Sequence, residues 1–434
     1  MINCYLFNGC LYKKGKAFKD FDEISSSLKV NRKLLNSMPI QAIILILDEY
    51  SRRLSKDKQL IGIEGSVYLS FYFKKSNVEK LIEISLGDKK YLDEFVYKGN
   101  GKFIKAQGRG ISCQWIAGNV YTLAFYSIFQ SLIAKNSNIV RVPEGSIPIV
   151  LKLLKPLYDI QVIYNDKIYS SQDILKNISL VYFSSKDEFF NKSMSITADS
   201  RIIWGGKEAV DHITSLPKKT TCKDIVFGPK YSFAVFDKDA VESDRCYSYM
   251  DKLVMDIILF EQKACSSPQV LFVEKSNISL NDIVKILKKS FEKIGKRYKN
   301  IMDEPQCARI INERGIYSLS LDKDICCSRG LEYTILINDD IKLEEPVGGR
   351  CIFIKQIDNI FDIEDLITHR IQTIGYAIEN RSKVLKFADM ITTYGVDRVV
   401  NIGSMNIYDS PWDGCFMISE LVRCCNLSAD FIYS

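Results

Sequence analysis

Apolar and polar positions along this chain follow two periods. Short apolar runs bounded by turn residues predict buried strands, and apolar residues that recur every three or four positions predict amphipathic helices. From about Gly101 onward the two patterns alternate, without internal repeats or low-complexity tracts. Such alternation is typical of βαβ units around a parallel sheet, so the sequence predicts an α/β fold.

The predicted elements cover most of the chain after residue 100. Strands are expected within 108–120, 138–143, 160–165, 179–185, 269–274, 333–339 and 350–357, with a strand, a glycine turn and a helix within 201–213. Helices are expected at 121–137, 146–157, 249–264, 280–298 and 363–378. Earlier in the chain, 37–54 is expected to form a helix with Ser37 as its cap and Pro39 in its first turn.

One uncharged stretch, residues 111–134, is long enough to be a transmembrane candidate. Gly118 and Asn119 form a turn signal within it, and polar residues such as Gln114 and Gln130 are scattered along it. Because polar groups are costly in lipid, a buried strand, a tight turn and a buried helix explain the stretch better.

Composition indicates a globular protein of the reducing cytoplasm. The chain has 434 residues, 47% of them hydrophobic, and a net charge of +6 from 59 basic and 53 acidic residues. This small excess, without basic blocks, argues against nucleic acid as a partner. Thirteen cysteines without a C-x-x-C pair, together with only two histidines, argue against a zinc site. The odd cysteine count and the lack of a secretory signal at Met1 favour a cytoplasmic location, with most thiols buried.

Polar residues follow two of the predicted strands, where α/β folds gather ligand-binding backbone amides. In the loop Gly118-Asn119, the Asn side chain could donate to a developing oxyanion, or could cap the next helix or simply form the turn. After the next strand, Arg141 could meet a nucleotide phosphate or ribose, and Glu144 could accept hydrogen bonds from ribose hydroxyls. Taken alone, a helix cap and an ordinary solvated ion pair are the simpler interpretations.

Three further features each have a functional and a structural interpretation. The pair Gly205-Gly206 either admits a phosphate close to the backbone or makes a tight turn between strand and helix. Cys265 lies between a predicted helix and a Pro-led strand, where a nucleophile could face a cleft, although free cysteines are more often buried and inert. His212 and His369 are isolated, and a single histidine on a helix is more often structural than a base.

The order of these features is more specific than any one of them. A Gly-Asn turn, a strand ending in a cation, "IIWGGKEAV", "GPKYSFAVF" and "EQKACSSPQVLFVE" together resemble the aldehyde dehydrogenase superfamily, and more closely its LuxC-type acyl-CoA (fatty acid) reductases. The segments "RIQTIGY" and "GVDRVVNIGSMNIYDSPWDGCFMISELVR" are similar to the C-terminal pattern of that family. The likeness covers roughly residues 100–425 and is firmest at 200–274 and 395–425.

The resemblance implies a role for each candidate residue. Cys265 takes the place of the nucleophilic cysteine, and Asn119 that of the Asn that, with the Cys265 backbone N–H, binds the oxyanion. Arg141 takes the place of a cofactor-contacting Lys. Gly205-Gly206 matches the turn that faces the cofactor pyrophosphate. The implied cofactor-binding residues are therefore Gly118, Arg141, Glu144, Gly205, Gly206 and Glu345, with Glu344 as the alternative to Glu345 at the nicotinamide ribose.

Two departures from the superfamily pattern bear on the reaction. Where aldehyde dehydrogenases carry the Glu that activates water against the acyl-enzyme, this chain has Val226, which cannot act as a base. Reduction of an activated acyl group is therefore favoured over oxidation of an aldehyde to a free acid. Glu144 lies where NAD-preferring relatives hold a ribose-binding acid that would repel a 2′-phosphate, whereas Arg141 could compensate. Since the LuxC-type family is expected to use NADPH, the expected cofactor is NADPH, with NADH close behind.

The resemblance implies an aldehyde dehydrogenase-like fold, with a Rossmann-like cofactor domain and an α/β catalytic domain. The expected division is a lead-in segment at 1–99, an NADPH-binding domain at 100–235, a catalytic domain carrying Cys265 at 236–394 and a C-terminal segment at 395–434.

The expected function is NAD(P)H-dependent reduction of an acyl thioester, from CoA or from a protein, to the aldehyde through a Cys265 acyl-enzyme. The alternatives are a catalytically silent acyl-binding subunit, a CoA-acylating aldehyde dehydrogenase that runs in the oxidative direction, or another nucleotide-binding α/β enzyme. The family also implies an acyl-protein synthetase partner and homo-oligomers. Neither a metal, nor nucleic acid, nor a membrane span is expected.

Overall fold

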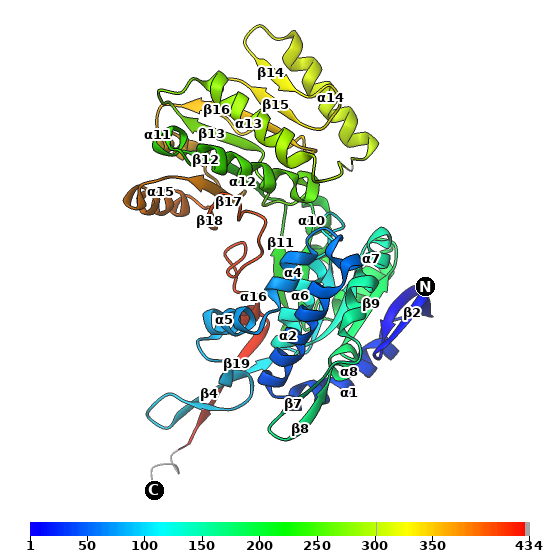
Figure 1. Cartoon of the computed structure of the whole chain (residues 1–434). Coiled ribbons are helices and arrows are strands. Elements are labelled where there is room, and N and C mark those ends of the chain that lie inside the picture. Colours follow the sequence, from blue (N-terminus) through cyan, green and yellow to red (C-terminus); the bar gives the residue numbers. More distant parts are fainter. Residues whose placement is uncertain (301, 430–434) are drawn as a thin grey trace. The chain divides into compact units, whose positions relative to one another are not determined.

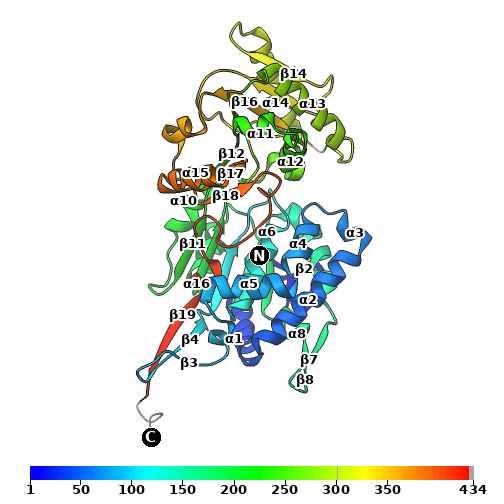
Figure 2. The same ribbon diagram turned by 60° about the vertical axis from the view of Figure 1, so that its left-hand side comes forward.

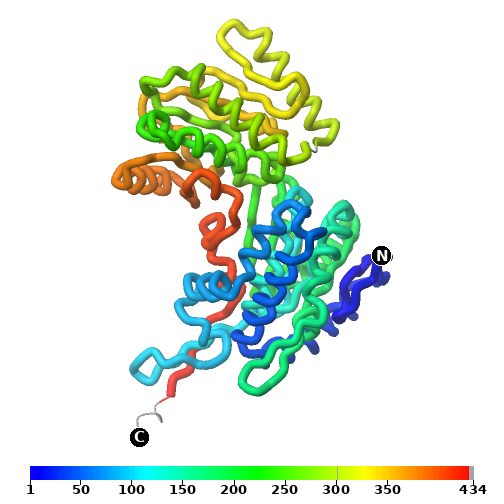
Figure 3. Tube along the Cα trace, viewed as in Figure 1, coloured from blue at the N-terminus to red at the C-terminus, as the bar shows by residue number. Residues whose placement is uncertain are grey.

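The computed structural model describes residues 1–300 and 302–429 and forms two compact units (Figures 1 and 3). The first unit comprises Met1–Gly228 and the chain from Tyr408 onward, and the second comprises Pro229–Ile407. Each unit is built on one seven-stranded sheet. The four segments expected from the sequence, with their boundaries, remain a prediction about functional parts.

The first sheet has a parallel centre. Its order is β11 (Lys223–Phe227), β10 (Ser200–Trp204), β5 (Ile111–Trp115), β6 (Ser137–Arg141), β9 (Ile178–Tyr182), β1 (Ile2–Phe7) and β2 (Cys10–Phe18). The strands β11 to β9 pair in parallel, whereas β1 and β2 are antiparallel. Along the chain, β5, β6 and β9 extend the sheet one way and β10 and β11 the other. This is the strand order of a Rossmann unit, whose ligand-binding switch point here lies between β5 and β10.

Helices cover both faces of this sheet, because successive strand residues point to opposite sides. Ile202 and Ile203, neighbours on β10, pack into different hydrophobic clusters. One cluster contains α2 (Ile40–Lys56), α3 (Lys58–Ile61), α4 (Ser66–Tyr72), α5 (Lys75–Leu86), α6 (Leu123–Ile133), α7 (Ile147–Leu154), α8 (Ser171–Leu175) and α16 (Met417–Glu420). The other contains α9 (Glu188–Thr197) and α10 (Lys207–Ser215), and α1 (Asp22–Ser37) contributes to both. The α/β class is thus confirmed.

Smaller elements complete the first unit. Figure 2 shows β19 (Val422–Ser428), β4 (Lys102–Gly108) and β3 (Val96–Tyr97) as neighbours in an antiparallel sheet. The predicted strand at 160–165 forms β7 (Gln161–Tyr164), which pairs with β8 (Lys167–Ser170) in a separate two-stranded hairpin. Single 3₁₀ turns lie at η1 (Lys89–Leu92), η2 (Glu144–Ser146) and η3 (Lys155–Leu157).

The uncharged stretch 111–134 divides as predicted into β5, a turn and α6. Ten of the eleven residues of α6 are buried, since the helix packs within the larger hydrophobic cluster of the unit. None of the helices in the described part of the chain has both the length and the hydropathy needed to cross a bilayer.

The predicted start of the helix at 37–54 is wrong in its capping. Ser37 ends α1, and its hydroxyl donates back to the Leu34 carbonyl. Pro39 precedes α2 at the N-cap, and its side chain has no oxygen to accept a hydrogen bond. The carboxylate of Asp93 supplies that acceptor instead, 3.0 Å from the Ile40 amide. A long-range residue therefore caps this helix, which no local signal could reveal.

The second sheet is also mainly parallel. Its order is β14 (Asp324–Cys327), β15 (Thr334–Ile337), β16 (Cys351–Ile357), β13 (Val270–Glu274), β12 (Tyr231–Phe236), β17 (Ile371–Ala377) and β18 (Arg398–Asn401), with β14 antiparallel. The helices α11 (Lys238–Glu242), α12 (Cys246–Ile258) and α13 (Leu280–Gly295) pack on one face, and α14 (Glu304–Leu319) and α15 (Arg381–Thr393) on the other. The 3₁₀ segments η4 (Leu259–Gln262) and η5 (Ile360–Leu366) complete this unit.

The predicted helix at 363–378 is wrong. The segment contains the end of η5, a turn and β17, which pairs with β12 and β18. Because β17 lies inside the sheet, both of its faces are buried, so the two-residue alternation that marks a half-exposed strand is absent. His369 therefore lies in an exposed turn before β17 and not on a helix.

Candidate active site

The first sheet brings the expected cofactor residues of its unit to one edge. Gly118 and Asn119 follow β5, Arg141 ends β6, and Gly205-Gly206 follow β10. The carboxyl ends of parallel strands meet at the same sheet edge, which is where ligands bind in such folds. The loops after β5 and β10 flank the switch point itself.

The loop after β5 packs closely against the loop after β6. A Cβ atom on Gly118 would lie 3.1 Å from Pro143 Cγ, so a larger residue would push the two loops apart. Asn119 is exposed in this loop. The N-cap of α6 is Thr122, so Asn119 does not occupy the cap position considered above.

The Arg141 guanidinium has one hydrogen-bond partner and leaves another of its donors unpaired. One terminal nitrogen donates to the Phe183 carbonyl at 3.3 Å, and the guanidinium lies 5.8 Å from the Phe183 ring centroid. Its Nε is buried without a hydrogen-bond partner. Burial lowers the pKa of Arg141 from its ordinary value. A buried donor at this edge is suited to an anionic or hydroxyl-bearing ligand.

The carboxylate of Glu144 interacts with Tyr182 at the end of β9. Their side-chain hydrogen bond raises the pKa of Tyr182, which the nearby Arg141 partly offsets. Glu144 therefore acts electrostatically on Tyr182 at this edge of the sheet.

The two glycines after β10 have different surroundings. A Cβ on Gly205 would lie 3.1 Å from Ala209 Cβ, whereas a Cβ on Gly206 would have no atom within 4 Å. Gly206 is the N-cap of α10 and has no side chain to occupy the first amides of the helix. This open helix N-terminus could receive a phosphate.

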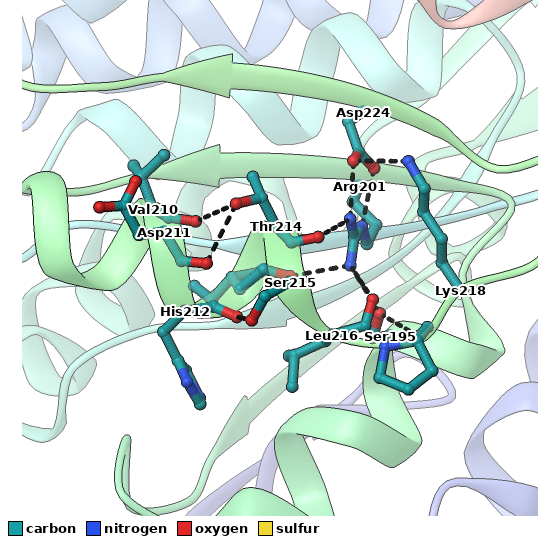
Figure 4. A network of polar contacts seen from close by, with 12 residues as sticks. Ser195, Arg201, Val210, Asp211, His212, Thr214, Ser215, Leu216, Lys218 and Asp224 are labelled. Atoms are coloured by element: carbon teal, nitrogen blue, oxygen red, sulfur yellow. Dashed lines mark hydrogen bonds and ion pairs between the residues drawn. The ribbon is translucent and has the colours of Figure 1, made fainter.

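Arg201 fixes the other end of α10 to the sheet (Figure 4). Its buried guanidinium binds both carboxylate oxygens of Asp224 on β11, at 2.7 and 2.6 Å. It also donates to the Ser195 hydroxyl and to carbonyls at the C-terminal end of α10, those of Ile213, Thr214 and Leu216. Burial raises the pKa of Asp224, but hydrogen bonds from Arg201 and Lys218 bring it below its ordinary value.

His212 lies on α10 with its ring directed away from this network (Figure 4). Its carbonyl accepts from the Ser215 hydroxyl, and its side chain is exposed.

Val226 lies on β11, an edge strand of the first sheet, directly opposite Ile203 of β10. Its side chain is 41% exposed, and it precedes the close of the strand at Phe227. The side chain at this exposed position is therefore apolar and has no group that could take a proton from water.

Cys265 lies in a turn of the second unit, just before β13. It is half-buried, unlike Cys4, whose burial raises its thiol pKa to about 12. The turn follows three residues with left-handed backbone, Phe260, Glu261 and Gln262, with φ between 47° and 62°. Such backbone is unfavourable for non-glycine residues and persists only where the surroundings impose it.

Two buried side chains impose that backbone. Glu261 binds Arg350 through both carboxylate oxygens, at 2.8 and 2.6 Å. Gln262 donates to the Pro268 and Cys351 carbonyls and accepts from the Cys351 amide. The turn that carries Cys265 is therefore fastened to the start of β16.

The two acids that the resemblance assigns to the nicotinamide ribose, Glu344 and Glu345, lie in the segment that leads to Arg350. Glu344 receives a hydrogen bond from the buried Lys355 at 2.9 Å, so its carboxylate already has a structural partner. Glu345 is exposed. Of the two, Glu345 is the better placed for a ligand, and Glu344 anchors its own loop.

Sequence reasoning missed the residues that hold these segments in place. Arg201, Tyr182 and Arg350 each act through partners distant in sequence, up to 89 residues for Arg350 and Glu261. The one local signal is Arg201, a charge inside the apolar run of a predicted strand, since such a charge must find a partner when buried.

Solved structures with the same fold define its class. A Thermus 1-pyrroline-5-carboxylate dehydrogenase with bound NAD aligns with a TM-score of 0.68 and 11% identity, covering 98% of this chain and 90% of that one. An NADP-dependent glyceraldehyde-3-phosphate dehydrogenase from Bacillus halodurans, complexed with NADP, aligns with a TM-score of 0.68 and 12% identity, covering 99% and 96%. These likenesses show an aldehyde dehydrogenase-like fold, as expected from the sequence.

The family is narrower than the fold. Residues 35–424 match the family described as Acyl-CoA reductase (LuxC). The long-chain acyl-protein thioester reductase of Vibrio harveyi is 24% identical over 436 residues, covering 93% of this chain and 86% of that protein. Long-chain acyl-protein thioester reductase 2 of Photobacterium leiognathi is 23% identical over 431 residues, covering 92% and 84%. The chain belongs to the acyl-CoA reductase (LuxC) family, and is thus an oxidoreductase that converts an acyl group to an aldehyde.

Proposed function

We propose that this protein reduces a long-chain acyl thioester with NADPH, through a covalent acyl-enzyme on Cys265. The observation that carries the proposal is a half-buried cysteine in a turn whose backbone is imposed by its surroundings, and the sequence resemblance adds that Val226 stands where aldehyde dehydrogenases carry a water-activating Glu. The first can form a thioester, and the second leaves that thioester without a base for hydrolysis.

The acylation step uses residues of this chain. The Cys265 thiolate attacks the acyl carbonyl carbon, the bond between that carbon and the donor sulfur breaks, and the donor leaves as a thiol after taking a proton from solvent. The developing oxyanion would receive hydrogen bonds from the Asn119 amide and the Cys265 backbone, contacts that typically contribute about 3–4 kcal/mol each. The product of this step is an acyl thioester on Sγ of Cys265.

The cofactor would be held by the edge of the first sheet. Arg141 offers a buried Nε without a partner, Gly206 leaves the N-terminus of α10 open, and Glu345 offers an exposed carboxylate. When bound, a reduced nicotinamide supplies the two electrons and the hydrogen that convert the acyl group to the aldehyde level. The bond from the former acyl carbon to Cys265 Sγ then breaks, which releases the aldehyde and restores the thiolate.

NADPH is favoured over NADH because of the state of Glu144. Its carboxylate interacts with Tyr182, which makes it less available to ribose hydroxyls, whereas Arg141 retains donor capacity for a 2′-phosphate. Following the relatives, we propose a protein-bound thioester or acyl-CoA as substrate, an acyl-protein synthetase as partner, a homo-oligomeric enzyme and a cytoplasmic location.

The test is aldehyde formation from tetradecanoyl-CoA with NADPH or NADH. The wild type should yield tetradecanal, and Cys265→Ala should lose at least 1,000-fold in rate, whereas Cys307→Ala, a half-buried thiol on α14 of the same unit, should retain activity. Equal rates in wild type and Cys265→Ala would overturn the nucleophile, and aldehyde oxidation to acyl-CoA without measurable reduction would favour the dehydrogenase alternative.

A further inference from the structure

We propose that Asn406 is a positioning residue for Cys265, because its side chain grips the two residues that follow the cysteine. The inference rests on the proposed function, in which Cys265 is the nucleophile. Asn406 itself lies in the segment after β18, 140 residues along the chain from Ser266.

Asn406 makes three side-chain hydrogen bonds while almost wholly buried. Its Oδ1 accepts from the Ser266 hydroxyl at 2.7 Å and from the Ser267 hydroxyl at 3.2 Å. Its Nδ2 donates to the carbonyl of Asp256 on α12 at 2.7 Å. The orientation of the amide is fixed by this last contact, because a reversed amide would set two oxygen atoms against each other.

The segment that carries Asn406 is itself held by an acidic and a basic side chain. The buried Asp256 carboxylate accepts from the Gly403 and Met405 amides, at 2.5 and 3.2 Å. The Arg398 guanidinium donates to the carbonyls of Ser404, Met405 and Ile407. Asp256 thus accepts from two amides of this short segment, and Arg398 donates to three of its carbonyls.

A glycine is required within this segment. Gly403 has φ +89°, a backbone conformation that side chains disfavour, and a Cβ there would lie 3.0 Å from Lys252 Cβ. The segment 403–407 is therefore a rigid support, and Asn406 is its contact with the Cys265 turn.

A further hydrogen bond holds the backbone of Cys265 itself. The Ser232 hydroxyl, at the start of β12, donates to the Cys265 carbonyl at 2.6 Å. Together with the bonds from Ser266 and Ser267 to Asn406, this fixes the chain that leaves Cys265 on its C-terminal side. The thiolate of a nucleophilic cysteine must approach the acyl carbonyl of the substrate within a narrow range of distance and angle. A misplacement of about 1 Å can cost roughly 100-fold in rate.

The experiment compares two reactions of the same thiol. Attack on tetradecanoyl-CoA requires a positioned sulfur, whereas alkylation by the small reagent iodoacetamide requires mainly a thiolate that can be reached. We expect Asn406→Ala to slow acylation of Cys265, followed by intact mass, at least tenfold, while alkylation changes less than threefold. Ser266→Ala removes one of the two hydroxyls that donate to Asn406 and leaves Asn406 in place. It should also slow acylation more than alkylation, by a smaller factor, and it keeps the test valid if Asn406→Ala misfolds.

Asn380→Ala is the matched control. It removes a side-chain cap from α15, after the carboxyl end of β17, whereas the Cys265 turn precedes the amino end of β13 in the same parallel sheet. It should lower the melting temperature without changing either reaction of Cys265. If Asn406→Ala and Ser266→Ala slow both reactions equally, or neither, the positioning role is wrong. If the wild type itself is not acylated, the proposed function fails and the role of Asn406 fails with it.

Discussion

At the scale of single residues, the proposed acyl-enzyme makes Val226 the position to test first. Replacing it by Glu places a carboxylate at an exposed strand end, where it costs little stability and can activate water. We expect Val226→Glu to release free tetradecanoic acid from tetradecanoyl-CoA without cofactor, at least tenfold faster than the wild type. The rate of acid release, measured by chromatography, checks this.

Val226→Gln is the control, since it has nearly the same shape as Glu and no basic oxygen. Acid release that rises equally in the Gln and Glu variants would show that water access, and not a missing base, protects the thioester.

Cofactor preference should respond to Tyr182. Removing its hydroxyl frees the Glu144 carboxylate, which can then accept from ribose hydroxyls and repel a 2′-phosphate. Tyr182→Phe should therefore shift the ratio of NADPH to NADH affinity toward NADH by roughly threefold to tenfold. Binding titrations with each cofactor measure the ratio, and Tyr164→Phe on β7 should leave it unchanged. A shift toward NADPH would contradict the arrangement.

At the scale of elements, Arg201 anchors α10. Arg201→Met leaves Asp224 with Lys218 alone and leaves the last carbonyls of the helix without their donor. We expect a loss of about 2–4 kcal/mol in the free energy of unfolding, less than for a fully enclosed pair because Lys218 remains. Lys207→Ala, which breaks an exposed pair on the same helix, should have no measurable effect. Similar losses in the two variants would argue against an anchoring role.

The support under the Cys265 turn should be sensitive to pH. Burial raises the pKa of Asp256 to about 7, although amides of Gly403 and Met405 and the charge of Arg398 oppose this. Because the folded pKa lies above the unfolded value, the folded state binds the extra proton below pH 7. The stability that proton binding by Asp256 contributes is therefore complete at low pH and is lost as the pH rises through 7. The free energy of unfolding falls by at most about 1.4 kcal/mol per pH unit over this range.

The measurement is the difference in unfolding free energy between wild type and Asp256→Asn from pH 5 to pH 8. The difference should fall with rising pH up to about 7 and then level off, because Asn does not titrate. A difference that stays constant across this range would mean that Asp256 is charged throughout.

At the scale of the whole molecule, the sequence predicts what depends on neighbours in the chain. The α/β class, most of the interior strands of the two sheets and the residues that follow those strands come from local periodicity. The helix expected at 363–378 fails because a strand buried on both faces has no period of two. The return of the chain from Tyr408 to the first unit, the Asp93 cap of α2, and the Arg350 and Asn406 contacts are all long-range, and one sequence carries no signal for them.

The most direct test of the acyl-enzyme is the intact mass of the protein after mixing with tetradecanoyl-CoA, first without and then with NADPH. The account predicts a single tetradecanoyl adduct that maps to Cys265 and disappears as tetradecanal forms. An adduct that persists with both NADPH and NADH would instead indicate a silent acyl carrier. An adduct on another residue, or aldehyde formed by Cys265→Ala, would contradict the assignment of Cys265 as the nucleophile.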